Sequence, residues 1–279
     1  MPVIVGIVVA MGGLALWGIA QSVTVAGVIT VIEIGGLGLV IFWGFVMSDG
    51  SGVPIVDLVP PLQGAHWGGI LSASILAFFA FIGFEDMVNV AEEVQDPRRN
   101  MPRAIVITLI VATVLYVVTC LAVLVAVPVD VLAVSDAPLA LVFEGAPAAV
   151  QSGFAAIAVV ATINGVLIQM IMASRVLYGM AGRGQMPRQL AHVSVRTQTP
   201  DVATICVTGV ILALAVFLPI ARLAEWTSLI VLGVFVFVNL SLVAIKVRAE
   251  PAEDHFAVPV VVPLLGTVAS IALLATALI

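Results

Sequence analysis

Eight long apolar segments, separated by short polar connections, constrain the fold of this chain more than any other feature of its sequence. A helix that crosses the hydrocarbon core of a bilayer needs about 20 consecutive, mostly apolar residues. Charged residues make up only 9% of the chain, against roughly a quarter in soluble domains, which is too few to cover a soluble fold. We therefore predict an all-α polytopic membrane protein with a single transmembrane domain over residues 1–279. The predicted spans are residues 3–20, 23–47, 70–94, 104–127, 148–180, 202–220, 226–246 and 258–279.

Basic residues are divided unevenly between the predicted loops. With eight alternating spans, nine of the 10 Lys and Arg residues fall on the side that carries the loops after the third, fifth and seventh spans. Because short cytoplasmic loops carry an excess of Lys and Arg, we expect these three loops in the cytoplasm and the protein in the cytoplasmic membrane. The same alternation places both termini outside the cell, with the first span beginning directly after Met1. We therefore expect further helices to flank this chain.

Several classes of function are excluded by the remaining residue patterns. Cys120 and Cys206 lie in separate apolar segments and the three histidines lie apart in loops, so the sequence predicts no metal site. It contains no phosphate-binding glycine-rich motif, no basic arm for nucleic acid, and no span with a nucleophile beside a base. We predict that the protein is not an enzyme, binds no cofactor or nucleic acid, and takes the energy for any transport from an ion gradient.

The stretch FAFIGFEDMVNVAEEVQDPRRNMPR, residues 79–103, is the strongest indication of function. It begins inside the third span and carries two adjacent carboxylates, Glu85 and Asp86, shortly after Gly83. A charge near the middle of a bilayer costs several kcal/mol, roughly 2.5–3.5 on insertion scales, so ionisable residues at this depth are functional by default. Glycine in a membrane helix also allows two helices to pack closely, which is the structural alternative here. The two acids favour a helix that is broken at Gly83.

A break at Gly83 would create a site for a small zwitterion. Unwound backbone at membrane depth is tolerated only where it lines a cavity or is buried in protein. Free amides there would bind a carboxylate, free carbonyls would bind an ammonium group or a cation, and aromatic rings would enclose a side chain. The rings available for this are those of Phe79, Phe81 and Phe84.

The two carboxylates beside the break need not share a role. Neighbouring residues point about 100° apart on a helix, so Glu85 and Asp86 face different surroundings. We predict that Glu85 exchanges a proton and that Asp86 caps the second half-helix, whose positive N-terminal dipole favours an anion. The alternative is that both acids are satisfied structurally at helix interfaces.

Glu33 is the second unusual charge, standing alone in the apolar run VTVAGVITVIEIGGLGLVIFWGF. An isolated buried carboxylate is either protonated or faces a polar path or a cation, so we predict a role in proton or cation coupling. Gly35, Gly36 and Gly38 follow, and we expect them to let another backbone approach closely. The alternative is a protonated Glu33 that makes one interhelical hydrogen bond. Asn164 in the fifth span is a further site candidate, although hydrogen bonding between helices would also explain it.

Four stretches of the sequence resemble a known family. The sixth-helix signature of the amino acid–polyamine–organocation (APC) superfamily of permeases resembles FFAFIGFEDMVNVAEEVQDPRRNMPRAI. The eighth helix of these permeases, with the short cytoplasmic helix after it, resembles NGVLIQMIMASRVLYGMAGRGQMP. Their fourth-to-fifth helix turn is similar to GIAQSVTVAGVITVIEIGGLGLVI, and the start of their eleventh helix to FAVPVVVPLLG. The resemblance extends over nearly the whole chain.

This resemblance implies a LeuT-type fold, in which helices 1–5 and 6–10 are inverted repeats. The eight spans would correspond to helices 4–11, so we expect a partial LeuT-type fold with a broken third span and without family helices 1–3 and 12. In the family, the substrate site is shared between the broken first and sixth helices. Together with the candidate from the fifth span, the predicted substrate-binding residues are Phe79, Ala80, Phe81, Ile82, Gly83, Phe84 and Asn164.

The resemblance also implies secondary active transport. We expect a permease that moves amino acids or related small amines across the cytoplasmic membrane, driven by a proton or sodium gradient or by exchange, with an amino acid and the lipid bilayer as its partners. Glu85 and Glu33 are the predicted coupling residues. The resemblance implies Lys at the position of Glu33 in many family members, where the Lys side chain takes the place of a coupling sodium ion. With a carboxylate at this position instead, the coupling ion could be either H⁺ or Na⁺. The alternative is a truncated, non-transporting fragment or a membrane assembly subunit.

Overall fold

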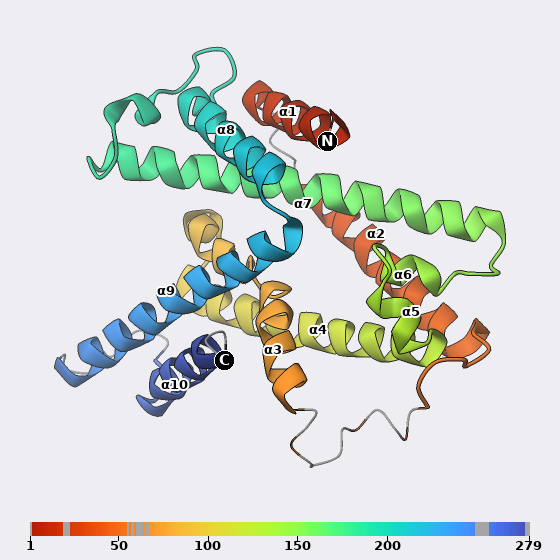
Figure 1. Ribbon diagram of the computed structural model, residues 1–279. Helices are drawn as coiled ribbons and strands as arrows, with labels where there is room; N and C mark the ends of the chain where they lie inside the picture. Colours follow the sequence, from red (N-terminus) through yellow and green to blue (C-terminus); the bar gives the residue numbers. More distant parts are fainter. Residues whose placement is uncertain are drawn as a thin grey trace. The chain divides into compact units, whose positions relative to one another are not determined.

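The computed structural model describes residues 2–18, 23–54, 56, 59, 64, 67–248 and 257–276, and these contain helices, turns and loops but no strand. Two of the short helices, η3 and η4, are 3₁₀-helices, and η1 is a π-helical turn. The elements are α1 (Pro2–Trp17), α2 (Val23–Phe42), η1 (Trp43–Met47), α3 (Trp67–Phe79), η3 (Phe84–Glu93), α4 (Pro97–Ala126), α5 (Val129–Ala133), α6 (Pro138–Leu141), α7 (Ala148–Gly182), η4 (Arg188–Ala191), α8 (Asp201–Phe217), α9 (Ile220–Arg248) and α10 (Val261–Thr276) (Figure 1).

Five stretches of helix are long and apolar enough to cross a membrane within the described residues. They are Gly27–Met47, Trp67–Asn89, Pro97–Ala126, Ala148–Gly182 and Ile220–Arg248. Three shorter apolar helices, α1, α8 and α10, fall where the other spans are predicted. These helices confirm an all-α polytopic membrane protein. The span limits and the orientation stay predictions, and residues 19–20 and 277–279 of the first and last predicted spans lie outside the described residues.

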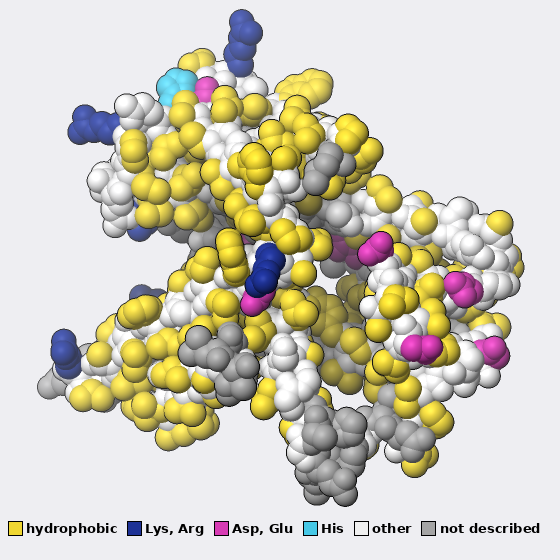
Figure 2. Space-filling view, viewed as in Figure 1, with side chains coloured by type: hydrophobic (Ala, Val, Ile, Leu, Met, Phe, Trp, Pro, Cys, Tyr) yellow, Lys and Arg dark blue, Asp and Glu magenta, His cyan; other side chains and the backbone are white. Residues whose placement is uncertain are grey.

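The exposed surface of these helices is apolar. Figure 2 shows hydrophobic side chains over most of the visible face, while Lys, Arg, Asp and Glu occur at scattered points. Ile230 of α9 and Val261 of α10, for example, are 68% and 60% exposed. Apolar surface of this kind costs nothing against lipid tails, which are as apolar as the side chains themselves. The surface therefore suits a bilayer.

The chain divides into two compact units. The first unit consists of Met1–Val59 and Thr113–Val216, and the second of Pro60–Ala112 and Phe217–Ile279. The division falls within α4, so this helix contributes its first part to the second unit and its last part to the first. The prediction of a single transmembrane domain stays a prediction.

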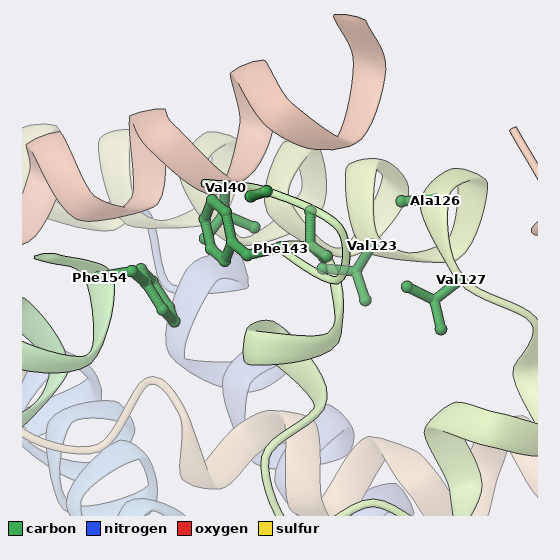
Figure 3. Close-up of a cluster of buried hydrophobic side chains, with 8 residues drawn as sticks. Val40, Val123, Ala126, Val127, Phe143 and Phe154 are labelled. Atoms are coloured by element: carbon green, nitrogen blue, oxygen red, sulfur yellow. The ribbon is translucent and has the colours of Figure 1, made fainter. Parts of the chain in front are cut away.

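The first unit is built on α7, which contacts α1 and α2. Leu167 and Met170 of α7 form a buried cluster with Val8, Met11 and Ala15 of α1. A second buried cluster joins the ends of α2 and α4 to the start of α7, and Figure 3 shows its side chains between these helices. This second cluster consists of Val40, Val123, Ala126, Val127, Val142, Phe143, Ala146 and Phe154.

The segment that follows η1 caps the C-terminal end of α4. The backbone amides of Gly52 and Val53 donate to the carbonyls of Val125 and Leu124, at 3.1 and 2.8 Å. The hydroxyl of Ser51 donates to the carbonyl of Ala126 at 3.2 Å. The last carbonyls of a helix have no partner within it, so these bonds satisfy groups that would otherwise be costly to bury.

The connection between α7 and α8 closes the C-terminal end of α1 in a similar way. The hydroxyl of Thr199 donates to the carbonyl of Leu16 at 3.0 Å. Nearby, Nδ1 of His192 lies 2.7 Å from Oδ1 of Asp201, the first residue of α8. This hydrogen bond holds the pKa of Asp201 below its ordinary value.

The second unit contains α3, α9 and α10, each of which contacts the other two. At the contact of α9 with α10, a β-carbon on Gly266 would lie only 2.7 Å from Oδ1 of Asn239. Nδ2 of Asn239 donates to the carbonyl of Phe235 one turn earlier, at 2.8 Å. Asn239 therefore lies between its own helix and α10, and a side chain at position 266 would require Asn239 to shift.

Candidate functional site

The third predicted span is broken between Phe79, where α3 ends, and Phe84, where η3 begins. Through the turn, the amides of Ala80 and Ile82 donate to carbonyls three residues back, at 3.2 and 3.1 Å, instead of the α-helical four. Gly83 then takes φ 122° and ψ −19°, a conformation that glycine adopts readily because it has no β-carbon. The predicted break at Gly83 is thereby confirmed, and the backbone conformation at this position favours glycine.

Glu85 binds the backbone at this break. The amide of Gly83 donates to Oε2 of Glu85 at 2.8 Å, so the carboxylate accepts a hydrogen bond from an amide that has no helical partner at the break. Oδ1 of Asp86 accepts from Nδ2 of Asn89 at 3.3 Å. Glu85 thus occupies the amide of Gly83, and the predicted capping of the second half-helix by Asp86 stays a prediction. The predicted proton exchange by Glu85 stays a prediction.

Phe235 of α9 contacts both sides of the break. The centroid of its ring lies 5.8 Å from that of Phe78 at an interplanar angle of 86°, and 5.9 Å from that of Phe84 at 63°. Edge-to-face arrangements of this kind are favourable for aromatic pairs. Sequence reasoning missed Phe235, because a phenylalanine in an apolar run carries no signal of its own.

The other residues predicted to bind substrate lie in and around the same turn. Phe79 is 41% exposed, and Phe81, Ile82 and Phe84 are half-buried. The ring of Phe84, which we expected to enclose a substrate side chain, also packs against α9. Whether these residues line a substrate site stays a prediction.

The two polar residues predicted in the second and fifth spans contact each other in the first unit. Nδ2 of Asn164 in α7 donates to Oε1 of Glu33 in α2 at 3.1 Å. Asn164 is only 7% exposed, and its Oδ1 is buried without a hydrogen-bond partner among the described residues. An unsatisfied buried amide oxygen costs about 1–3 kcal/mol, so this atom is a candidate ligand for a cation or for a proton donor.

The helices meet closely beside this pair. A β-carbon on Gly36 would lie 2.8 Å from Cγ2 of Ile157 in α7, whereas no described atom lies within 4 Å of one on Gly35 or Gly38. The expectation that all three glycines receive a neighbouring backbone is therefore wrong. Residues three or four apart share one face of a helix, and Gly36 shares the face of Glu33 that meets α7.

The predicted site residues are thus distributed over both units. Residues 79–85 lie in the second unit, while Glu33 and Asn164 lie together in the first. The broken backbone and its carboxylate offer groups for an ammonium or a carboxylate, and the Glu33–Asn164 pair offers two oxygen ligands and a titratable group. Such a set of groups is typical of transporters with discontinuous membrane helices.

Comparison with known proteins agrees with this class. A profile of the amino acid permease family matches residues 2–279, and the chain belongs to this family and so to the APC superfamily. It is 29% identical over 200 residues to the branched-chain amino acid permease BcaP of Bacillus subtilis, an alignment that covers 71% of this chain and 43% of the permease. It is 30% identical over 247 residues to the mitochondrial cationic amino acid transporter 3 of Arabidopsis thaliana, covering 86% of this chain and 40% of that protein.

A third relative is named for a different substrate. The methylthioribose transporter of Bacillus subtilis is 29% identical over 196 residues, covering 69% of this chain and 42% of that protein. The chain thus spans about two fifths of the length of these curated relatives. The family and the relatives are transporters and not enzymes, in keeping with the prediction of a non-enzyme.

Proposed function

We propose that this protein is a secondary active transporter that moves amino acids or related small amines across the cytoplasmic membrane. The observation that carries the proposal is the helix broken at Gly83 in a chain of the amino acid permease family. Two of the relatives are named for amino acid substrates, branched-chain in one case and cationic in the other. The basic loops after the third, fifth and seventh predicted spans would face the cytoplasm.

The substrate would bind at the turn between α3 and η3. Backbone groups that have left the α-helical pattern bind the two charged ends of an amino acid, the carbonyls taking the ammonium and the amides taking the carboxylate. The amide of Gly83 already holds a carboxylate, that of Glu85, at 2.8 Å. A substrate carboxylate would therefore have to replace Glu85 at this amide.

Protonation of Glu85 is the natural way to make this replacement possible. A neutral carboxyl accepts a hydrogen bond less strongly than a carboxylate, because charge-assisted bonds are about twice as strong as neutral ones. When Glu85 takes up a proton, the amide of Gly83 becomes available to the substrate. Proton uptake and substrate binding would then favour each other, which is the requirement for proton-coupled transport.

The Glu33–Asn164 pair would serve the coupling ion. Carboxylate and amide oxygens are ligands for hard cations, and the buried, unpartnered Oδ1 of Asn164 belongs to the residue that contacts the half-buried Glu33. A Na⁺ ion would take both oxygens, whereas a proton on Glu33 would donate to Oδ1 of Asn164 after rotation of the amide. Because the pair joins α2 to α7, either event would change how these two helices are held together.

Uptake into proteoliposomes tests the proposal. The chain is reconstituted, and uptake of radiolabelled leucine, arginine and methylthioribose is followed under an imposed pH gradient, an imposed Na⁺ gradient, and with unlabelled amino acid inside. We expect saturable uptake of at least one amino acid that depends on one of these driving forces. Uptake no greater than that of protein-free liposomes under all three conditions would refute the proposal.

Two variants separate the proposed roles. Glu85→Ala frees the amide of Gly83 permanently, so substrate binding should persist while its dependence on pH is lost. Glu33→Gln keeps an oxygen that accepts from Nδ2 of Asn164 but cannot titrate, so uptake should lose its response to the coupling ion. If both variants respond to pH and Na⁺ as the unmodified protein does, neither carboxylate is a coupling residue.

A further inference from the structure

The turn between α3 and η3 is weakly fixed by its own backbone. The amides of residues 80, 81 and 82 make short-range bonds to carbonyls three residues back, at 3.0–3.2 Å. The next amide, that of Gly83, donates to the side chain of Glu85 and not to the preceding helix. No α-helical ladder therefore continues across the turn to set the direction in which η3 leaves α3.

Phe235 supplies a connection that the backbone lacks. Phe78 lies in the last turn of α3 and Phe84 is the first residue of η3, and both rings contact the ring of Phe235. A change in the angle between α3 and η3 therefore has to alter at least one of these two contacts. In lipid, where burial gives helices no hydrophobic driving force, such directional contacts decide how segments pack.

Phe235 lies on α9, which packs against α10. The carbonyl of Phe235 accepts from Nδ2 of Asn239 at 2.8 Å, and Oδ1 of Asn239 lies where Gly266 of α10 leaves no room for a β-carbon. The ring that contacts both sides of the break therefore lies on a part of α9 that packs against α10 and is outside the segment that contains the break.

We propose that Phe235 is a positioning residue, an aromatic clamp whose two ring contacts set the angle between α3 and η3. Its consequence for transport rests on the proposed function, because the clamp keeps the backbone groups of the turn in the geometry that a substrate needs. The clamp itself is a property of α3, η3 and α9 and does not depend on any substrate.

Amide hydrogen exchange tests the clamp without transport. Phe235→Leu removes both ring contacts and keeps an apolar side chain, and Phe237→Leu on the same helix is the matched control, since Phe237 is 73% exposed. Each lost aromatic pair should speed exchange at residues 80–89 by about 2- to 10-fold, from the usual strength of such pairs. Phe235→Tyr keeps the ring and should restore slow exchange.

Two results would overturn the clamp. The first is exchange at residues 80–89 that is the same in Phe235→Leu and Phe237→Leu. The second is exchange that rises equally throughout α3, α9 and α10, because this indicates a general loss of packing. If Phe235→Leu is too unstable to purify, Phe78→Leu removes one of the two contacts from the other side. Phe78→Leu should speed exchange at residues 80–89 by about 2- to 10-fold, the factor expected for the loss of one aromatic pair. No change in exchange at these residues would also refute the clamp.

Uptake kinetics give the second readout. Loss of the clamp should raise KM by about tenfold with a smaller change in kcat, because the substrate then has to order the turn on binding. Phe235→Tyr should restore KM, and Phe237→Leu should leave it unchanged. If the unmodified protein shows no uptake, the proposed function fails, whereas the exchange measurement still decides the clamp.

Discussion

Replacement of Gly83 by alanine perturbs the break at a single β-carbon. Gly83 has φ 122°, outside the regions that residues with a side chain normally occupy. Holding a non-glycine residue in such a conformation costs about 1–3 kcal/mol. Alanine also favours helix over glycine by about 1 kcal/mol, which promotes a continuous helix through the turn. Both effects act against the broken form.

The expected result is a less stable and inactive protein. At about 2–4 °C per kcal/mol, the strain alone should lower Tm by about 2–12 °C. If the chain relieves the strain by straightening, the amide of Gly83 leaves Glu85 and the predicted substrate site is lost. Uptake should then fall to the background level even where Tm recovers.

The measurement is thermal unfolding in detergent, together with uptake by the same preparation. Gly209→Ala in α8 is the matched control, because no described atom lies within 4 Å of a β-carbon there and the residue is helical. This control should keep or raise Tm. If Gly83→Ala matches Gly209→Ala in both Tm and uptake, the broken backbone is not required and the reasoning is wrong.

Three further predictions concern other contacts. Glu33→Gln should leave the free energy of unfolding within about 1 kcal/mol of that of the unmodified protein, because Nδ2 of Asn164 keeps an acceptor. Glu33→Ala should lower the free energy of unfolding by more than this, and equal losses in the two variants would contradict the prediction. Gly266→Val should reduce the free energy of unfolding by about 1–3 kcal/mol through its clash with Asn239, and Asn239→Ala should relieve part of that loss in a double-mutant cycle. The pKa of Asp201 is lowered by His192, so the stability it contributes is present above the ordinary aspartate pKa and lost as pH falls through the lowered one. Asp201→Asn should therefore flatten Tm against pH in that acidic range, and an unchanged profile would mean that the contact adds nothing.

Local features of the sequence predicted local features of the structure. The break at Gly83 follows from a glycine and two acids within four residues of one apolar run, so its position could be predicted without any knowledge of neighbours. The apolar segments likewise predicted the helices, since length and hydropathy are properties of each segment alone.

Pairings between segments could not be predicted in this way. Glu33 and Asn164 were each singled out, but they are 131 residues apart, and one sequence does not show which of several polar residues will meet. The same limit explains the error over Gly35 and Gly38, because which face of α2 meets α7 is decided by packing. It also explains why Phe235, an ordinary residue of an apolar helix, was missed beside the break.

The side chain of Glu85 occupies the amide of Gly83, the same group to which we propose that the substrate carboxylate binds. A carboxylate fixed two residues from the amide acts as a tethered ligand, with an effective local concentration in the millimolar range or above. On the proposed function, a free amino acid would compete with Glu85 for this amide, so its apparent affinity would be its intrinsic affinity multiplied by the fraction of time that the amide is unoccupied. Weak apparent affinity has a benefit for a carrier, because a solute that is held too tightly on one side is released too slowly on the other. On the proposed function, the same contact would set an upper limit on substrate affinity and a lower limit on the rate of substrate release.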